Sequence, residues 1–195
     1  MKLLQLILPL FLFNCCTYNK IVINKDEFNR LQKINYSDVT PSISNCCWVL
    51  VENGMSGWDS ILYKQKNCEI AENEIKGKFI VGFDEQGLPV PSYKYIISYD
   101  KQKSTYWSTP DSLKLFLGEI NNISEAQILT KGYNYFSSTE SVYKIDSDGY
   151  LMVLYKLVKT GFPIQVDKFL LKVTKNGKIK IIAREVSSKI KNGII

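Results

Sequence analysis

Near the C-terminus, apolar and polar residues alternate on both sides of an Asn-Gly pair, and this pattern constrains the fold more than any other. In FLLKVTKNGKIKIIA, a period of two predicts a pair of antiparallel strands with one buried face. A three-residue loop, Lys175-Asn176-Gly177, sets apolar residues opposite one another, whereas a two-residue loop would set Val173 opposite Lys180. The resulting pairs are Val173 with Ile179, Leu171 with Ile181 and Phe169 with Ala183. We therefore predict the three-residue loop, with Gly177 in the left-handed conformation.

The preceding stretch, SVYKIDSDGYLMVLYKLV, predicts a second hairpin around Ser147-Asp148-Gly149. The same reasoning pairs Ile145 with Leu151 and Tyr143 with Val153 across it. The letters DSDG also begin a calcium-loop pattern, but its third oxygen ligand and its later Glu are missing, which favours a turn. The C-terminal third is thus predicted to be a sheet of three or four consecutive antiparallel strands, followed by a frayed helix in EVSSKIKNGII.

The middle of the chain combines strand and helix signals. Four segments rich in β-branched and aromatic residues are predicted to be strands: CCWVLVE, DSILYK, GKFIVGF and SYKYIISYD. The stretch EQGLPVPS, with two prolines close together, is predicted to be a loop. Two helices are predicted after it: the first is capped by Ser108 or Thr109 and ends at Gly118, and the second runs from Ser124 to Gly132.

A short helix is also predicted near the N-terminus, in NKDEFNRLQKIN. Asn24 is a suitable N-cap there, and Phe28, Leu31 and Ile34 recur at helical spacing. With 195 residues, the chain is long enough for one domain with an ordinary core. The predicted fold class is α+β: a single domain dominated by antiparallel β-sheet, with a short N-terminal helix and a central helical pair.

The chain opens with a short apolar run that ends at two adjacent cysteines. The run covers residues 3–13, and only Gln5 and Pro9 interrupt it. A membrane-spanning helix needs about 20 residues, so this run is too short to span. With Lys2 before it, the run is typical of the apolar region of a secretory signal.

The end of this run, Leu12-Phe13-Asn14-Cys15, resembles a bacterial lipoprotein signal, in which a Leu lies three residues before the cysteine that takes the lipid. Phe13 and Asn14 depart from the small residues usual there. The resemblance implies a signal peptide over 1–14, an acyl anchor such as palmitate on Cys15, a tether over 15–24 and a domain over 25–195; Cys16 is the alternative lipidation site. Two or three acyl chains hold stably, because each buried methylene contributes about 0.8 kcal/mol.

The stretch SLKLFLGEINNISEAQILTKGYNY resembles a segment of small exported lipoproteins of Bacteroidetes-type bacteria. In that family a helix ending in Phe-Leu-Gly is followed by an I-[ND]-x-x-x-EA helix and a Gly-Tyr pair. The resemblance covers about 25 residues and implies a location, but no activity. The acidic export signal of such lipoproteins is absent from CTYNK, which favours the outer membrane with the domain facing the periplasm.

In an exported chain the remaining four cysteines, an even number, predict disulfide bonds. Cys46 and Cys47 lie on opposite faces of the predicted strand, so they should not share a partner. The returning strand would bring Cys68 back to one of them. We favour Cys46–Cys68 and keep Cys47–Cys68 as the alternative; the leftover thiol pairs with Cys16 or stays buried as a small apolar group.

The composition excludes several function classes. The chain has no histidine, which removes Ser-His-Asp and Cys-His catalysis and His-ligated zinc. The net charge of +6 comes from lysines spread singly along the chain, and the only two arginines, Arg30 and Arg184, lie far apart. Nucleic-acid binding needs clustered basic residues, so we predict no nucleic-acid partner. We also predict no cofactor and no metal site.

The candidate contact residues are aromatic. They lie at a predicted hairpin tip and along the segment SYKYIISYDKQKSTYW: Trp58, Tyr93, Tyr95, Tyr99 and Trp107. We therefore predict a membrane-tethered, non-catalytic binding or interaction module, an accessory subunit or an inhibitor, with an envelope protein or glycan as partner. One alternative is a carboxylate-based glycan hydrolase, which needs two acidic residues about 5–9.5 Å apart across a cleft. The available acids are Glu52, Asp59, Asp84 and Glu85. The other alternative is a purely structural envelope component.

Overall fold

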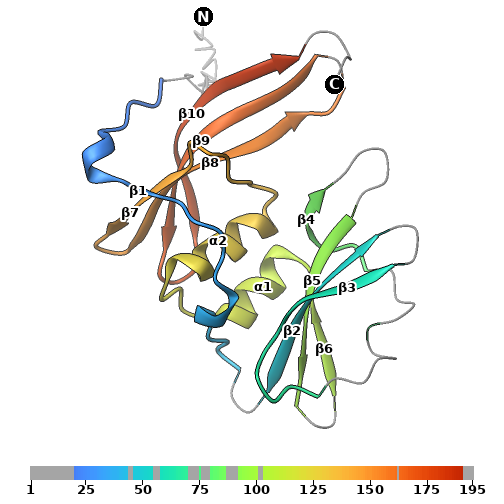
Figure 1. Cartoon of the computed structure of the whole chain (residues 1–195). Helices are drawn as coiled ribbons and strands as arrows, with labels where there is room; N and C mark the ends of the chain where they lie inside the picture. The colour runs from blue at the N-terminus through green and yellow to red at the C-terminus, as the bar shows by residue number, and fades with distance from the viewer. Residues whose placement is uncertain are drawn as a thin grey trace, which may run out of the picture.

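The computed structural model describes residues 20–43, 46–54, 58–69, 75, 80–86, 92–100, 103–161 and 163–190. In these residues ten strands form two antiparallel sheets, and two α-helices lie between the sheets (Figure 1). This arrangement confirms the predicted α+β class with predominant antiparallel sheet. The predicted signal peptide, Cys15 and Cys16 lie outside the described residues.

The first sheet has the strand order β1-β7-β8-β9-β10. Its strands are β1 (Asn29–Arg30), β7 (Val142–Asp146), β8 (Gly149–Lys159), β9 (Ile164–Thr174) and β10 (Ile179–Ile190). The last four are consecutive in the chain and antiparallel, as the alternating patterns predicted. Strand β10 stays paired with β9 as far as Ile190, so the predicted frayed helix is wrong over residues 185–190; residues 191–195 lie outside the described residues.

The β9–β10 hairpin has the predicted loop and, near it, the predicted register. Val173 pairs with Ile179, and Gly177 adopts a left-handed φ of 71°. The register then shifts between Ile181 and Ala183, so Phe169 pairs with Arg184 and the predicted pairing with Ala183 is wrong. This bulge sets Arg184 on the core-facing side of the strand, where it reaches a buried carboxylate.

The β7–β8 hairpin is one residue tighter than predicted. Asp146 pairs with Gly149, which leaves Ser147 and Asp148 as a two-residue loop, and Tyr143 pairs with Met152 and not with Val153. The observed register keeps Tyr143 on the face of the fully buried Met152, where it packs against the core. The three-residue loop and both predicted pairs are therefore wrong, although the DSDG stretch does form the turn.

The second sheet has the order β3-β2-β5-β4, and β6 also pairs with β5. Its strands are β2 (Cys47–Gly54), β3 (Asp59–Lys64), β4 (Phe83–Gln86), β5 (Ser92–Tyr99) and β6 (Ser104–Trp107). The strands predicted in CCWVLVE, DSILYK and SYKYIISYD are confirmed. In GKFIVGF, residues 77–79 lie outside the described residues, and the prediction is wrong for residues 80–82, because β4 begins at Phe83. The strand continues through Glu85 and Gln86, which were predicted to be loop. Strand β6 was not predicted.

The central helical pair is confirmed as α1 (Pro110–Leu117) and α2 (Ile123–Gly132). Thr109 caps α1 through a hydrogen bond from the Ser112 amide, and Gly118 ends the helix. The predicted N-terminal helix is wrong. It is replaced by the 3-10 turn η1 (Lys25–Glu27) and then by β1, because the backbone here bonds to the edge of β7 and not to itself.

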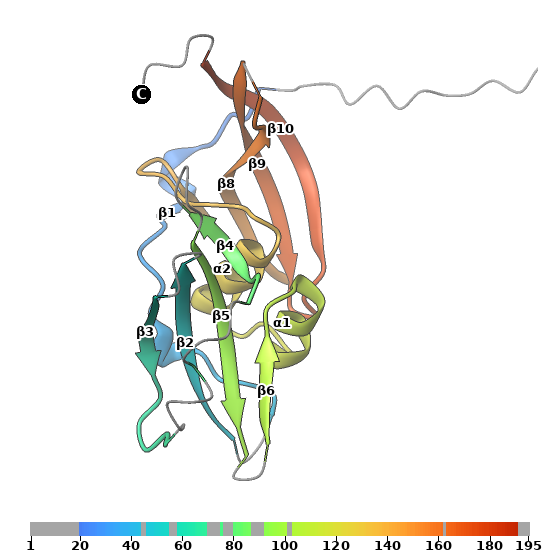
Figure 2. The ribbon, with the colours of Figure 1, turned by 90° about the vertical axis from the view of Figure 1, so that its right-hand side faces the viewer.

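The main core lies between the two sheets and includes both helices (Figures 1 and 2). Its fully buried side chains include Trp48 and Ile96 of the second sheet, Phe116 of α1 and Met152 of the first sheet. A smaller core covers the other face of the second sheet and contains Val49, Val51, Cys68, Ile75, Tyr95 and Ile97. Because one core joins both sheets, they pack as a single domain.

Residues 31–43, here called the N-terminal strap, connect the two sheets. The strap leaves β1, runs past α2 through the 3-10 turn η2 (Tyr36–Asp38) and reaches β2 (Figure 1). Leu31 donates its backbone amide to the Ser141 carbonyl at 2.9 Å, and Ser42 donates to the Phe116 carbonyl at 2.9 Å. The strap is thus fixed at both ends and crosses the helical layer as an extended segment.

Candidate functional site

The predicted aromatic contact residues do not form one exposed platform. Tyr95 is fully buried in the smaller core, and the Trp107 indole donates to the Ser98 hydroxyl at 2.8 Å and packs on Phe116. Trp58 is 45% exposed, and its ring lies over Gly54. The remaining two, Tyr93 and Tyr99, are half-buried on β5. These side chains mainly cover their own sheet.

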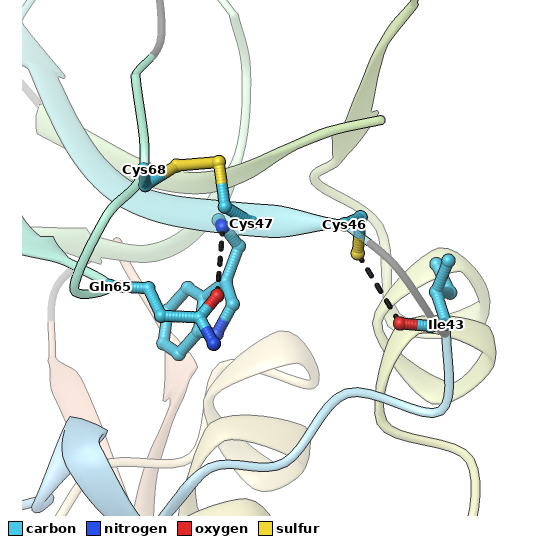
Figure 3. The surroundings of a disulfide bond; sticks show 6 residues. Ile43, Cys46, Cys47, Gln65 and Cys68 are labelled. Atoms are coloured by element: carbon cyan, nitrogen blue, oxygen red, sulfur yellow. Dashed lines mark hydrogen bonds between the residues drawn. A yellow bond between two sulfur atoms is a disulfide. The ribbon is translucent and has the colours of Figure 1, made fainter. Parts of the chain in front are cut away.

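The disulfide bond joins Cys47 to Cys68, with their Cα atoms 5.1 Å apart (Figure 3). The favoured pairing of Cys46 with Cys68 is wrong, and the alternative pairing is the observed one. The reason is the side of the sheet: Cys68 is buried in the smaller core, and Cys47 packs against that core. Among the described cysteines Cys46 is free, and its thiol donates to the Ile43 carbonyl at 3.4 Å. Burial raises the pKa of the Cys46 thiol, so it is not an activated nucleophile.

A cleft of about 490 Å³ opens between the strap, helix α2 and the first sheet, a volume typical of small-molecule sites. Its polar lining consists of amides, hydroxyls and ammonium groups: Gln32, Lys33, Tyr36, Gln127, Thr130, Lys131, Tyr135 and Ser137. Its apolar floor is formed by Leu31, Ile34 and Leu154. Among the described residues that line it, no side chain carries a carboxylate. The cleft therefore combines hydrogen-bonding capacity with positive charge.

Helix α2 holds the strap wall of the cleft in place through side-chain hydrogen bonds. The Gln127 amide donates to the Gln32 carbonyl at 2.8 Å, and the Asn35 backbone amide donates to the Ser124 hydroxyl at 3.2 Å. The buried Glu125 accepts from the Thr40 backbone amide at 2.9 Å. These bonds satisfy backbone groups of the strap that a sheet or a helix would otherwise satisfy. The backbone of this wall is therefore held in position by hydrogen bonds within the protein itself.

Behind this wall, Asp84 forms the centre of a buried charged cluster. Its two carboxylate oxygens accept from Lys94 Nζ at 2.6 Å and from Lys131 Nζ at 2.7 Å, and its side chain is 6% exposed. Asp84 also has a φ of 54°, which costs about 1–3 kcal/mol for a residue other than glycine. Burial by itself raises the pKa of Asp84, but the ammonium groups of Lys131 and Lys94 outweigh it and lower the pKa. Asp84 is therefore a fixed anion.

Two further groups complete the cluster. Glu52 lies 3.9 Å from Lys94 Nζ and accepts from the Ser92 hydroxyl at 3.0 Å. Burial, assisted by the charges of Asp84 and Glu52, raises the pKa of Tyr36 to about 12. Because Tyr36 also lines the cleft, it presents a phenol that stays protonated and can donate a hydrogen bond.

Glu52 and Asp84 are the two acids that a glycan hydrolase of this sequence would most readily use. Both contact the same ammonium group, Lys94 Nζ, which lies between their oxygens. A glycosidase needs one carboxyl that is protonated at working pH, and the pKa of Asp84 is lowered, not raised. Asp84 is therefore held as an anion by its two lysines and does not supply the protonated carboxyl that this chemistry needs.

Sequence reasoning missed most of this site. The cluster joins five residues from different parts of the chain: Tyr36, Glu52, Asp84, Lys94 and Lys131. No spacing in the sequence brings them together. The one local signal in the sequence was the predicted strand that ends at Phe83. In the structure, the pairing of β4 with β5 shifts register between Phe83 and Gln86, and Asp84 has its unusual backbone conformation within that shift.

Within the described ranges, no three Cys, Asp or Glu side chains come together as a potential metal site. The same ranges contain no helix with the length and apolarity needed to cross a membrane. Comparisons of the chain with protein-family models, with curated proteins and with solved structures found no match. The cleft and its charged cluster are therefore the features on which a functional proposal can be built.

Proposed function

We propose that this protein is a non-catalytic binding module of the bacterial cell envelope that holds a polar ligand in the cleft beside helix α2. The proposal depends on one observation: the cleft is lined by side-chain amides, hydroxyls and ammonium groups on an apolar floor. Small-molecule sites typically combine an apolar lining with a few placed polar groups. A lipid on Cys15, implied by the signal sequence, would tether the module to the membrane.

The rigidity of the polar groups supports binding over a merely structural role. Lys131 is fixed by Asp84, and Gln127 is fixed by its bond to the strap. Groups that are ordered before binding lose little entropy on complex formation, which favours affinity. Asp84 combines an unusual backbone conformation with burial and positions a lysine at the cleft, and such features cluster at functional sites.

Site-directed photo-crosslinking tests this proposal in the native envelope. p-Benzoylphenylalanine would replace the exposed Ser137 at the cleft and, as a matched control, the exposed Ser60 on strand β3. We expect an adduct after illumination at position 137 and none at position 60, with mass spectrometry of the labelled peptide identifying what was captured. Equal labelling at both positions, or none at position 137, would contradict binding in the cleft.

A further inference from the structure

The charged side chains that line the cleft are basic. Lys33 and Lys131 belong to the lining, and among the described lining residues none is acidic. Lys131 Nζ gives one hydrogen bond to Asp84, and an ammonium group has three donors. Lys33 is exposed and has no ion pair among the described residues. Donors therefore remain for a ligand on both sides of the cleft.

Lys156 is a third ammonium group; it is not a lining residue of the cleft but contacts one, Tyr135. It lies two residues after Leu154 on β8, and alternate residues of a strand share a face. Its Nζ atom lies 5.0 Å from the ring centroid of Tyr135, which lines the cleft. Lys156 is half-buried, and in the described part of the chain it has no ion pair and no hydrogen-bond partner.

The carboxylate that stands opposite Lys156 accepts its hydrogen bonds from other residues. Asp167 stands directly opposite it on β9, but this fully buried carboxylate accepts from Arg184 Nε at 2.6 Å and from Gln165 Nε2 at 2.7 Å. Burial lowers the pKa of Lys156, and no neighbouring carboxylate offsets that effect. A partly desolvated ammonium without a counter-ion favours binding of an anion.

The identity of the anion follows from the other groups of the cleft. The lining residues of α2, from Gln127 to Lys131, belong to the C-terminal half of the helix, where the helix dipole is negative. This negative end disfavours any anion close to it, and it disfavours a doubly charged phosphate more than a singly charged carboxylate. The amides and hydroxyls, including Gln127 and Ser137, match the hydroxyl groups of a sugar.

Building on the proposed function, we infer that the ligand is a carboxylate-bearing sugar of the uronic acid class. Its carboxylate would bind Lys156 and Lys33, and its hydroxyl groups would bind the amides and hydroxyls of strap and helix. The ionic part of this recognition would weaken with salt, because the cleft is open to solvent.

Isothermal titration calorimetry on the full-length protein tests the inference, with D-glucuronate, D-glucose and inorganic phosphate as probes. We expect glucuronate to bind at least about tenfold more tightly than glucose or phosphate, since charge-assisted hydrogen bonds are stronger than neutral ones. Lys156→Gln and Lys33→Gln should each weaken glucuronate binding about tenfold and leave glucose binding unchanged. Lys180→Gln, which removes an exposed charge of β10 outside the cleft, is the control and should change neither.

Three results would overturn the inference: equal affinity for glucuronate and glucose, preference for phosphate, or no effect of the Lys156 and Lys33 variants. Thermal melts would verify that both variants fold, which is expected because neither substitution breaks an ion pair between described residues. If only the inference fails, the photo-crosslinked adduct at position 137 still forms. If the proposed function fails as well, that adduct is also absent.

Discussion

Asp84 accepts a hydrogen bond from Lys131 at 2.7 Å, and this ion pair ties strand β4 to helix α2. The same carboxylate accepts from Lys94 of strand β5, so one buried side chain connects three elements. It does so in a left-handed backbone conformation, with a φ of 54°. Since Lys131 also lines the cleft, the stability of this part of the fold and the shape of the candidate site depend on the same residue.

We expect Asp84→Asn to destabilise the protein by about 3 kcal/mol at pH 7, because it removes the anion that two largely buried lysines share and leaves Lys94 only Glu52 at 3.9 Å. Asparagine tolerates a left-handed φ, so the substitution removes charge without adding backbone strain. Urea unfolding of both proteins measures the difference. Glu27→Gln, which breaks the exposed pair with Lys144, is the control and should leave stability unchanged.

The Asp84 contribution should also depend on pH in one direction. Its pKa is lower in the folded protein than the ordinary value of 3.8, so the folded state favours the charged form. The stabilisation is therefore complete above about pH 5 and is lost as the pH falls through the lowered pKa. Unfolding measured between pH 7 and pH 2 should show the parent and Asp84→Asn converging in acid. A constant difference across that range would show that charge is not the cause.

Cysteine variants separate the two pairings of Cys68. Cys47→Ala should abolish the bond and reduce stability by about 3.4 kcal/mol, the chain-entropy value for a loop of about 22 residues. Cys46→Ala should keep the bond and nearly all of the stability, because Cys46 is not part of the disulfide and its thiol makes only a weak hydrogen bond to the Ile43 carbonyl, at 3.4 Å. Non-reducing mass spectrometry and thermal unfolding follow the two variants. Retention of the bond in Cys47→Ala, through Cys46, would show that the two cysteines are interchangeable.

Two hairpin glycines should differ in their tolerance of alanine. At Gly149, with a φ of 138°, an added Cβ would lie 2.1 Å from the Val173 carbonyl oxygen, so we expect a loss of about 3 kcal/mol. At Gly177, with a φ of 71°, the nearest atom is a flexible Lys114 carbon at 3.1 Å, so a loss of about 1 kcal/mol is expected. Thermal unfolding of the two alanine variants measures both losses of stability. Equal losses at Gly149 and Gly177 would contradict the tight two-residue turn at Ser147-Asp148.

The lipid anchor is tested by the intact mass of the protein purified from its own membranes. We expect a chain that begins at Cys15 and carries two or three acyl chains, since one chain binds only marginally. Cys15→Ser should remove the added mass and release the protein from the membrane fraction. Cys16→Ser is the matched control and should leave both unchanged. A chain that begins at Met1 without lipid would overturn the envelope assignment.

The features that the sequence determined by itself are those encoded within a few residues. The alternation around Asn176-Gly177 specified the loop and the first pairs of the β9–β10 hairpin, and Thr109 and Gly118 specified both ends of α1. In these cases the deciding interactions join neighbours in the chain: a turn conformation, a capping hydrogen bond and a side-chain period. Interactions between neighbours in the chain can therefore be predicted from a single sequence.

Tertiary packing decided the rest. The bulge before Ala183 sets Arg184 where it reaches Asp167, and Cys47 rather than Cys46 bonds to Cys68 because the smaller core lies on that face. The cleft formed because β1 pairs with the edge of β7 and the strap follows it, where the residue spacing had predicted a helix. Charges and hydrogen bonds of this kind join residues far apart in the chain. Their energy depends on distances that exist only once the two sheets have packed around the helices.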